Sequence, residues 1–183
     1  MSKEIVLFLH GKGADKNAHH DFAKALAQAN DAKLVTLNAP FLHKQGYSWF
    51  GKANIDGVRR LDEDEFHHSL SLIKNELLGL NVDMQQVTIC GHSQGGALAI
   101  AVGLELPLKK VISICGDIPF EVSKDIKTPA AEFVWIEGGK DVFLSEERKK
   151  SYQKLAGRGL NFRYLVDENT EHDVFSGELL DKL

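Results

Sequence analysis

Six short apolar segments alternate with longer segments of helical character, and this alternation limits the possible folds more than any other feature. Several of the apolar segments are continuous rather than alternating, which is typical of a parallel sheet covered on both faces. The predicted strands are Ile5–Leu9, Lys33–Leu37, Val87–Cys90, Val111–Cys115, Phe133–Ile136 and Phe162–Val166. The pattern predicts an α/β protein with a mostly parallel sheet of six or seven strands and helices on both faces.

Helices are predicted between these strands, and Asp62–Leu80 has the clearest periodicity. Its apolar residues Phe66, Leu70, Ile73 and Leu77 are three or four positions apart and would form one buried stripe. The predicted helices are Lys16–Ala29, Asp62–Leu80, Gln94–Glu105, Ser145–Ala156 and a short closing helix from Val174. Asn38–Arg60 is predicted to be irregular, and loops of that length are usually functional or mobile.

The composition indicates an ordinary globular protein of 183 residues, and we expect one domain over 1–183 with no separate lid domain. The net charge of −4 and the absence of a basic block make nucleic acid an unexpected partner. No apolar run is long enough to span a bilayer or to form a signal-peptide core, so we expect a cytoplasmic protein without stable membrane insertion. The two cysteines, Cys90 and Cys115, have no metal-site spacing and are interpreted as small buried side chains. No metal or other cofactor is expected.

The segment from Val87 to Ile100 predicts a strand, a tight turn and a helix in immediate succession. The turn is Gly91-His92-Ser93-Gln94-Gly95, in which the two glycines would let the strand and helix approach closely. Ser93 at its apex would adopt a strained backbone conformation that exposes its hydroxyl, as a nucleophile requires. Alone, the pattern is also compatible with a glycine-rich turn and a capping serine.

Further reactive groups follow other predicted strands, and the carboxyl ends of parallel strands meet at one edge of a sheet. His10-Gly11-Lys12-Gly13 follows the first strand, Asp141 the fifth and His172 the sixth. Each has an ordinary interpretation, namely a turn, a helix cap and a solvated loop residue. Together they have the order Ser, Asp, His of a hydrolase triad. Asp117 after the fourth strand and Asp173 next to His172 are alternative acids.

The chain resembles the phospholipase/carboxylesterase family of α/β-hydrolases, which contains bacterial carboxylesterases and acyl-protein thioesterases. The similar segments are Leu9–Gly13, Asn38–Pro40, Ser48–Phe50, Gly91–Leu98, Ser113–Gly116, Gly139–Val142 and Glu171-His172. The chain departs from the family pattern at Gly138-Gly139, Glu171 and Gly51. The resemblance implies an α/β-hydrolase fold and favours Asp141 over Asp117 as the acid.

These roles predict a serine hydrolase that cleaves short- to medium-chain carboxylic esters. Ser93 would be the nucleophile, His172 the base and Asp141 the residue that orients it. The backbone N–H groups of Lys12 and Gln94 would stabilise the oxyanion.

The irregular segment supplies two candidate substrate contacts, Trp49 and Phe50, which could cover an acyl chain or could simply pack the loop onto the core. The alternatives for function are an acyl thioesterase, a lysophospholipase or a non-catalytic binding protein on the same fold. A small-molecule ester or thioester is the expected partner, and the sequence does not define the oligomeric state.

Overall fold

The computed structural model describes residues 4–55, 58–117, 131–174, 180 and 183. Its main element is a six-stranded sheet in which all neighbouring strands are parallel. The strands are β1 (Glu4–Leu9), β2 (Ala32–Leu37), β7 (Val87–His92), β8 (Lys110–Ile114), β9 (Glu132–Gly138) and β10 (Asn161–Asp167). All six predicted strands are confirmed.

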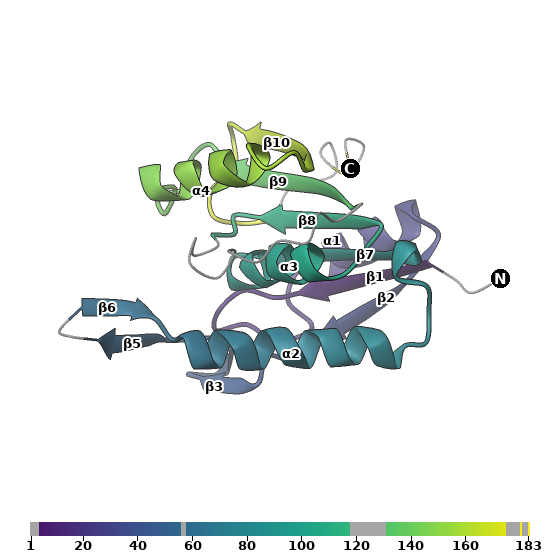
Figure 1. Ribbon diagram of the computed structural model, residues 1–183, viewed down its shortest axis with the longest axis horizontal. Coiled ribbons are helices and arrows are strands. Elements are labelled where there is room, and N and C mark those ends of the chain that lie inside the picture. The colour runs from purple at the N-terminus through teal and green to yellow at the C-terminus, as the bar shows by residue number, and fades with distance from the viewer. Residues whose placement is uncertain (1–3, 56–57, 118–130, 175–179, 181–182) are drawn as a thin grey trace.

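The strand order β10-β9-β8-β7-β1-β2 places the first strand inside the sheet (Figure 1). From β1 the chain adds β2 on one side, then crosses back to add β7 on the other side. The connections at the carboxyl ends of β1 and β7 therefore leave in opposite directions. In open parallel sheets a crevice forms at such a position, and ligands bind there.

The helices that the structure describes cover the two faces of the sheet unequally. Helix α1 (His20–Ala29) packs its buried Phe22 and Leu26 on one face with Val6 and Phe8. Helices α2 (Glu63–Gly79), α3 (Gln94–Glu105) and α4 (Glu146–Ala156) pack on the other face, where Trp135 and Leu98 lie in the larger core cluster. The predicted apolar stripe of α2 is confirmed, since all four of its residues are buried.

The helix ends follow capping chemistry. The Asp62 side chain accepts a hydrogen bond from the Glu65 N–H at the start of α2, and Ser145 accepts one from the Arg148 N–H at the start of α4. Helix α1 begins four residues later than predicted, after His19 in a left-handed conformation. The predicted closing helix from Val174 falls mostly on residues 175–179 and 181–182, which lie outside the described part of the chain.

The segment 38–60 is not irregular, contrary to the prediction. It contains the hairpin β3 (Phe41–His43) and β4 (Gly46–Ser48), and most of the hairpin β5 (Lys52–Ile55) and β6 (Val58–Leu61). Strands of three or four residues are too short to produce a clear period-two pattern, although Asp-Gly at 56–57 is a typical hairpin signal. In Figure 1 the second hairpin extends beyond the N-terminal end of α2.

Among the described residues, no helix has the length and apolar character needed to cross a membrane.

Candidate active site

Ser93 occupies a strained turn between β7 and α3. Its backbone has φ 54° and ψ −114°, a combination that side-chain-bearing residues rarely adopt. A Cβ atom on Gly91 would collide with the Gly95 carbonyl, and one on Gly95 would collide with the Leu9 carbonyl. The two glycines are therefore required by close approach of the backbone, as the sequence predicted.

We expect Gly91→Ala to destabilise the protein by about 3 kcal/mol or more, because the new methyl group meets rigid backbone rather than a movable side chain. The matched control is Gly79→Ala at the end of α2, where a Cβ has no neighbour within 4 Å. That variant should change stability by less than about 1 kcal/mol. Urea unfolding of both variants tests this difference, and equal losses would contradict the steric role of Gly91.

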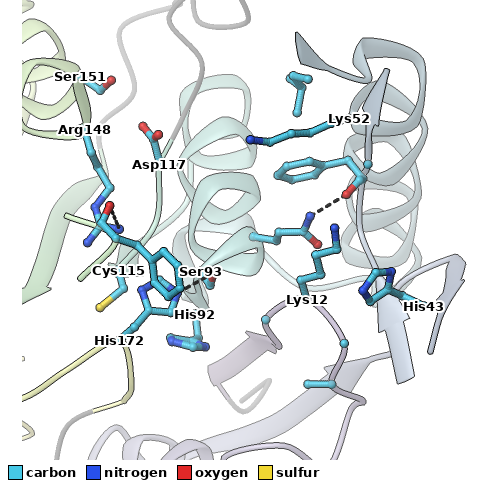
Figure 2. Close-up of a pocket in the computed structure, with 18 of the residues that line it drawn as sticks. Lys12, His43, Lys52, His92, Ser93, Cys115, Asp117, Arg148, Ser151 and His172 are labelled. Atoms are coloured by element: carbon cyan, nitrogen blue, oxygen red, sulfur yellow. Dashed lines mark hydrogen bonds between the residues drawn. The ribbon is translucent and has the colours of Figure 1, made fainter. Parts of the chain in front are cut away.

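The structure brings Ser93, His172 and Asp141 into one hydrogen-bonded chain, and Figure 2 shows its link between Ser93 and His172. His172 Nε2 lies 2.9 Å from Ser93 Oγ, and His172 Nδ1 lies 2.7 Å from Asp141 Oδ2. Of the two alternative acids, Asp173 contacts His19 at 3.5 Å and Asp117 lines the cleft, whereas His172 Nδ1 pairs with Asp141. This geometry is that of a nucleophile, a base and an orienting carboxylate.

Arg148 and Glu137 extend this chain into the protein, and the sequence analysis missed both. Arg148 on α4 places Nη2 2.5 Å from Asp141 Oδ2, the oxygen that also faces His172. The same guanidinium forms two hydrogen bonds with Glu137, which also accepts one from Trp135 Nε1 at 2.7 Å. Glu137 and Arg148 are 1% and 3% exposed. The acid of the triad is therefore held by a buried ion cluster.

Burial and pairing shift the pKa values of this cluster in opposite directions. Burial opposes the ionisation of Asp141, but hydrogen bonds from Arg148, His172 and the Phe143 N–H outweigh it and lower its pKa to about 2. Burial dominates at Glu137 and raises its pKa to about 7 despite the bonds from Arg148 and Trp135. Asp141 is consequently a stable anion at neutral pH, as an orienting residue must be.

The loop proposed to bind the oxyanion is fixed from two sides. His10 Nε2 accepts a hydrogen bond from the Ala39 N–H, and His10 Nδ1 lies 2.7 Å from the Gly11 carbonyl. The Gly13 N–H donates to the Tyr47 carbonyl at 2.7 Å, which ties the loop to the hairpin β3–β4. The backbone N–H groups of Lys12 and Gln94 form no hydrogen bond with any residue that the structure describes.

The Gln94 side chain has a structural role that the sequence did not indicate. Its Oε1 accepts hydrogen bonds from Ser48 Oγ and the Trp49 N–H, and its Nε2 donates to the Phe50 carbonyl at 2.6 Å. These three bonds attach the end of β4 and the two residues that follow it directly to the nucleophile turn.

The two predicted substrate contacts lie in different places. Trp49 is fully buried in the larger core cluster, and its Nε1 donates to the His10 carbonyl at 2.8 Å. Trp49 does not line the cleft, so its position agrees with packing of the loop onto the core and not with contact to an acyl chain. Phe50 is half-buried and lines the cleft together with Leu61 and Phe143. Substrate contact stays a prediction for Phe50.

The cleft above Ser93 has a volume of about 1410 Å³ and opens between the hairpin β5–β6 and helix α4. Figure 2 shows Lys12 and Lys52 reaching into it from the side opposite Arg148 and Ser151. Phe143 is 67% exposed, and its ring packs edge-on at 5.0 Å against the His172 ring. The cleft thus combines apolar surfaces beside the triad with charged residues around them.

His92 is a buried histidine beside the triad. Its ring lies 4.9 Å from that of His19 and 5.1 Å from that of His172, and neither ring nitrogen has a hydrogen-bond partner among the described residues. Burial lowers the pKa of His92 to about 4. His92 is therefore neutral at neutral pH and places no positive charge against His172.

This histidine should make the protein sensitive to acid. Its pKa is about 6.5 when unfolded and about 4 when folded, so the unfolded state binds more protons between these values. Stability then falls by about 3 kcal/mol as the pH falls from 6.5 to 4. We expect His92→Phe to gain stability relative to wild type by a similar amount between pH 7.5 and pH 4.5. Chemical unfolding at both pH values checks this, and a pH-independent difference would contradict it.

Cys115, Asp141 and His172 have potential metal-ligand atoms within 4.8 Å of one another. Burial raises the pKa of the Cys115 thiol to about 12, and the Asp141 oxygen already accepts hydrogen bonds from Arg148 and His172. A protonated thiol and a carboxylate oxygen that is already hydrogen-bonded are poor metal ligands. We therefore assign no metal to these three residues.

The parallel sheet, the strained serine turn and the Ser-Asp-His chain define an α/β-hydrolase. The model of the phospholipase/carboxylesterase family matches residues 1–132. The chain therefore belongs to this family, as its motifs indicated. The matched span includes the loop after β1 and the nucleophile turn, whereas Asp141 and His172 follow it and are placed by the structure.

Individual relatives agree with this assignment. Acyl-protein thioesterase 1 of Saccharomyces cerevisiae is 30% identical over an alignment covering 59% of this chain and 54% of that protein, so the chain spans about half of its length. The structure of esterase PE8 has a TM-score of 0.76 at 24% identity, covering 99% of this chain and 89% of the other. Acyl-protein thioesterase 2 of Zea mays has a TM-score of 0.76 at 15% identity, covering 100% and 91%. The two structural similarities concern the fold.

Proposed function

We propose that the protein is a serine hydrolase that cleaves short- to medium-chain carboxylic esters through an acyl-serine intermediate. The observation that carries the proposal is the hydrogen-bonded chain from Ser93 Oγ through His172 to Asp141. Family membership supports the reaction class. Phe50, Leu61 and Phe143 offer apolar surface for an acyl chain of modest length.

The reaction follows from the positions of these groups. Ser93 Oγ attacks the ester carbonyl while His172 Nε2 accepts the hydroxyl proton, and Asp141 stabilises the resulting imidazolium. The N–H groups of Lys12 and Gln94 would donate to the oxyanion. Collapse of the tetrahedral intermediate breaks the bond to the leaving alcohol, which takes the proton from His172. Water, deprotonated by His172, then releases the acid and restores Ser93.

The test combines turnover with covalent labelling. We expect p-nitrophenyl acetate, butyrate and octanoate to be hydrolysed, and a fluorophosphonate probe to add to the peptide that contains Ser93. Folded protein that neither hydrolyses these esters nor takes up the probe would contradict the proposal and favour a binding protein on the same fold.

An acyl thioesterase is the second candidate, because the yeast relative is named an acyl-protein thioesterase. Thioesters and oxyesters of the same acyl groups separate the two functions. A higher kcat/KM for the oxyester series favours the carboxylesterase, and a higher value for the thioester series favours the thioesterase.

A further inference from the structure

Positive side chains are concentrated around the nucleophile. Among the described residues that line the cleft, seven are Lys or Arg and two are Asp or Glu. The whole chain has the opposite balance, with 22 Lys and Arg against 26 Asp and Glu. The cations are Lys12, Lys44, Lys52, Arg60, Arg148, Lys150 and Lys154, and the acids are Glu63 and Asp117. The cleft is therefore cationic on an anionic protein.

These cations come from both sides of Ser93. Lys12 follows β1, Lys44 lies in the turn between β3 and β4, and Lys52 and Arg60 belong to the hairpin β5–β6. Lys150 and Lys154, one turn apart on α4, line the opposite side. A ligand bound over Ser93 would thus lie between two positive walls.

Most of this charge is not neutralised by neighbouring carboxylates. Arg148 is paired with Glu137 and Asp141, but Lys12, Lys44, Lys52 and Arg60 form no ion pair with any acidic residue in the described parts of the chain. All four are exposed in the cleft. Like charges gathered in a concave surface create a field that attracts and orients an anionic ligand.

We propose that the cleft selects esters or thioesters that carry a carboxylate or phosphate group near the scissile carbonyl. This inference rests on the proposed serine-hydrolase function and specifies its substrate class. The anionic group binds the cations Lys44, Lys52 and Arg60 and takes no part in the bond changes, while uncharged parts of the substrate contact Phe50 and Phe143. The charge can lie in the acyl group or in the leaving group, according to which of the two extends toward these three cations.

Two matched substrate pairs test the proposal and locate the charge. The first pair shares p-nitrophenol as leaving group and compares the monosuccinyl ester with the butyryl ester. The second pair shares the butyryl group and compares 4-hydroxybenzoate with 4-hydroxybenzamide as leaving group. We expect the anionic member of at least one pair to have a kcat/KM about tenfold higher at low salt. This preference should decline as the ionic strength rises from about 10 mM to about 0.5 M.

Charge-removing variants connect the preference to the cleft. Lys44→Gln, Lys52→Gln and Arg60→Gln should each lower the anionic-to-neutral ratio of kcat/KM about two- to threefold, and the triple variant should bring it close to one. The matched control is Lys33→Gln on β2, an exposed lysine that does not line the cleft and removes the same charge.

Equal kcat/KM values for the anionic and neutral members of both pairs would overturn the inference. A loss of the anionic-to-neutral ratio in Lys33→Gln equal to that in the cleft variants would also overturn it. In both cases, turnover of the neutral esters would leave the proposed serine-hydrolase function standing. Absence of both labelling and turnover of every ester would instead overturn the proposed function.

Discussion

Replacement of Ser93 by alanine should lower kcat for ester hydrolysis by about 10⁶-fold, because the proposed acyl intermediate forms on the hydroxyl oxygen that this change removes. The residual rate should still exceed the reaction in water by about 10³- to 10⁴-fold, since the groups that would stabilise the oxyanion remain in place. The variant should fold, because Ser93 Oγ forms a single hydrogen bond with the described part of the chain, the one to His172. Covalent labelling by a fluorophosphonate should be lost together with turnover.

The matched control for this experiment is Ser71→Ala, which makes the same change at an exposed serine on α2. It should retain wild-type turnover and labelling. Ser93→Ala with more than about one-hundredth of wild-type kcat would contradict the nucleophile assignment, since removal of a nucleophile costs far more.

Replacement of Arg148 by methionine should have the largest effect on stability, a loss of about 3–5 kcal/mol at neutral pH. The change leaves two buried carboxylates, Glu137 and Asp141, without their shared cation. It also frees Asp141 Oδ2 from one of the two donors that position it, so kcat should fall as well. Urea unfolding and steady-state turnover measure the two effects.

The loss in Arg148→Met should depend on pH with a defined sign. In wild type the folded pKa of Glu137 is about 7, above its ordinary value of 4.5, so stability already falls as the pH rises from 4.5 to 7. Without Arg148 both carboxyl groups bind protons more tightly in the folded state, which makes this fall larger. We therefore expect a smaller loss at pH 5 than at pH 8, whereas an equal loss at both values would point to packing alone.

A second variant separates charge from position. Glu137→Gln in the Arg148→Met background removes one of the unpaired carboxylates while keeping an acceptor for Trp135 Nε1. The double variant should regain stability relative to Arg148→Met but not turnover, because Asp141 still lacks its donor. Recovery of both properties would show that Arg148 acts on stability only.

The sheet and the convergence of Ser93, His172 and Asp141 could be predicted because they depend on strong local signals. Continuous apolar runs identified all six strands of the sheet, and the helix Gln94–Glu105 has the predicted bounds. The glycine spacing at Gly91 and Gly95 reflects contacts within one turn, so it is visible in the sequence. Asp141 and His172 could be placed because the ends of parallel strands converge at one edge.

The ion cluster and the hairpins could not be predicted in the same way. Arg148 lies in a very polar segment, and its burial depends on Glu137 and Asp141 from a separate strand and loop. The only local signal is its spacing from Tyr152 and Leu155, which places a cation on the inward face of α4. The contacts of Gln94 with Trp49 and Phe50 join residues more than 40 positions apart, and no pattern in either segment predicts them.

The bonds from Gln94 to the segment 48–50 have a consequence for redesign of the enzyme. The side chain of Gln94 holds one wall of the cleft in place. Its backbone N–H is the group that we propose donates a hydrogen bond to the oxyanion. The width of the cleft and the rate of the chemical step are therefore linked through one residue. Library mutagenesis aimed at bulkier acids should succeed at Phe50 or Leu61, whose side chains can be exchanged independently. Selections that displace the backbone at 48–50 should instead widen the range of substrates and lower the catalytic rate.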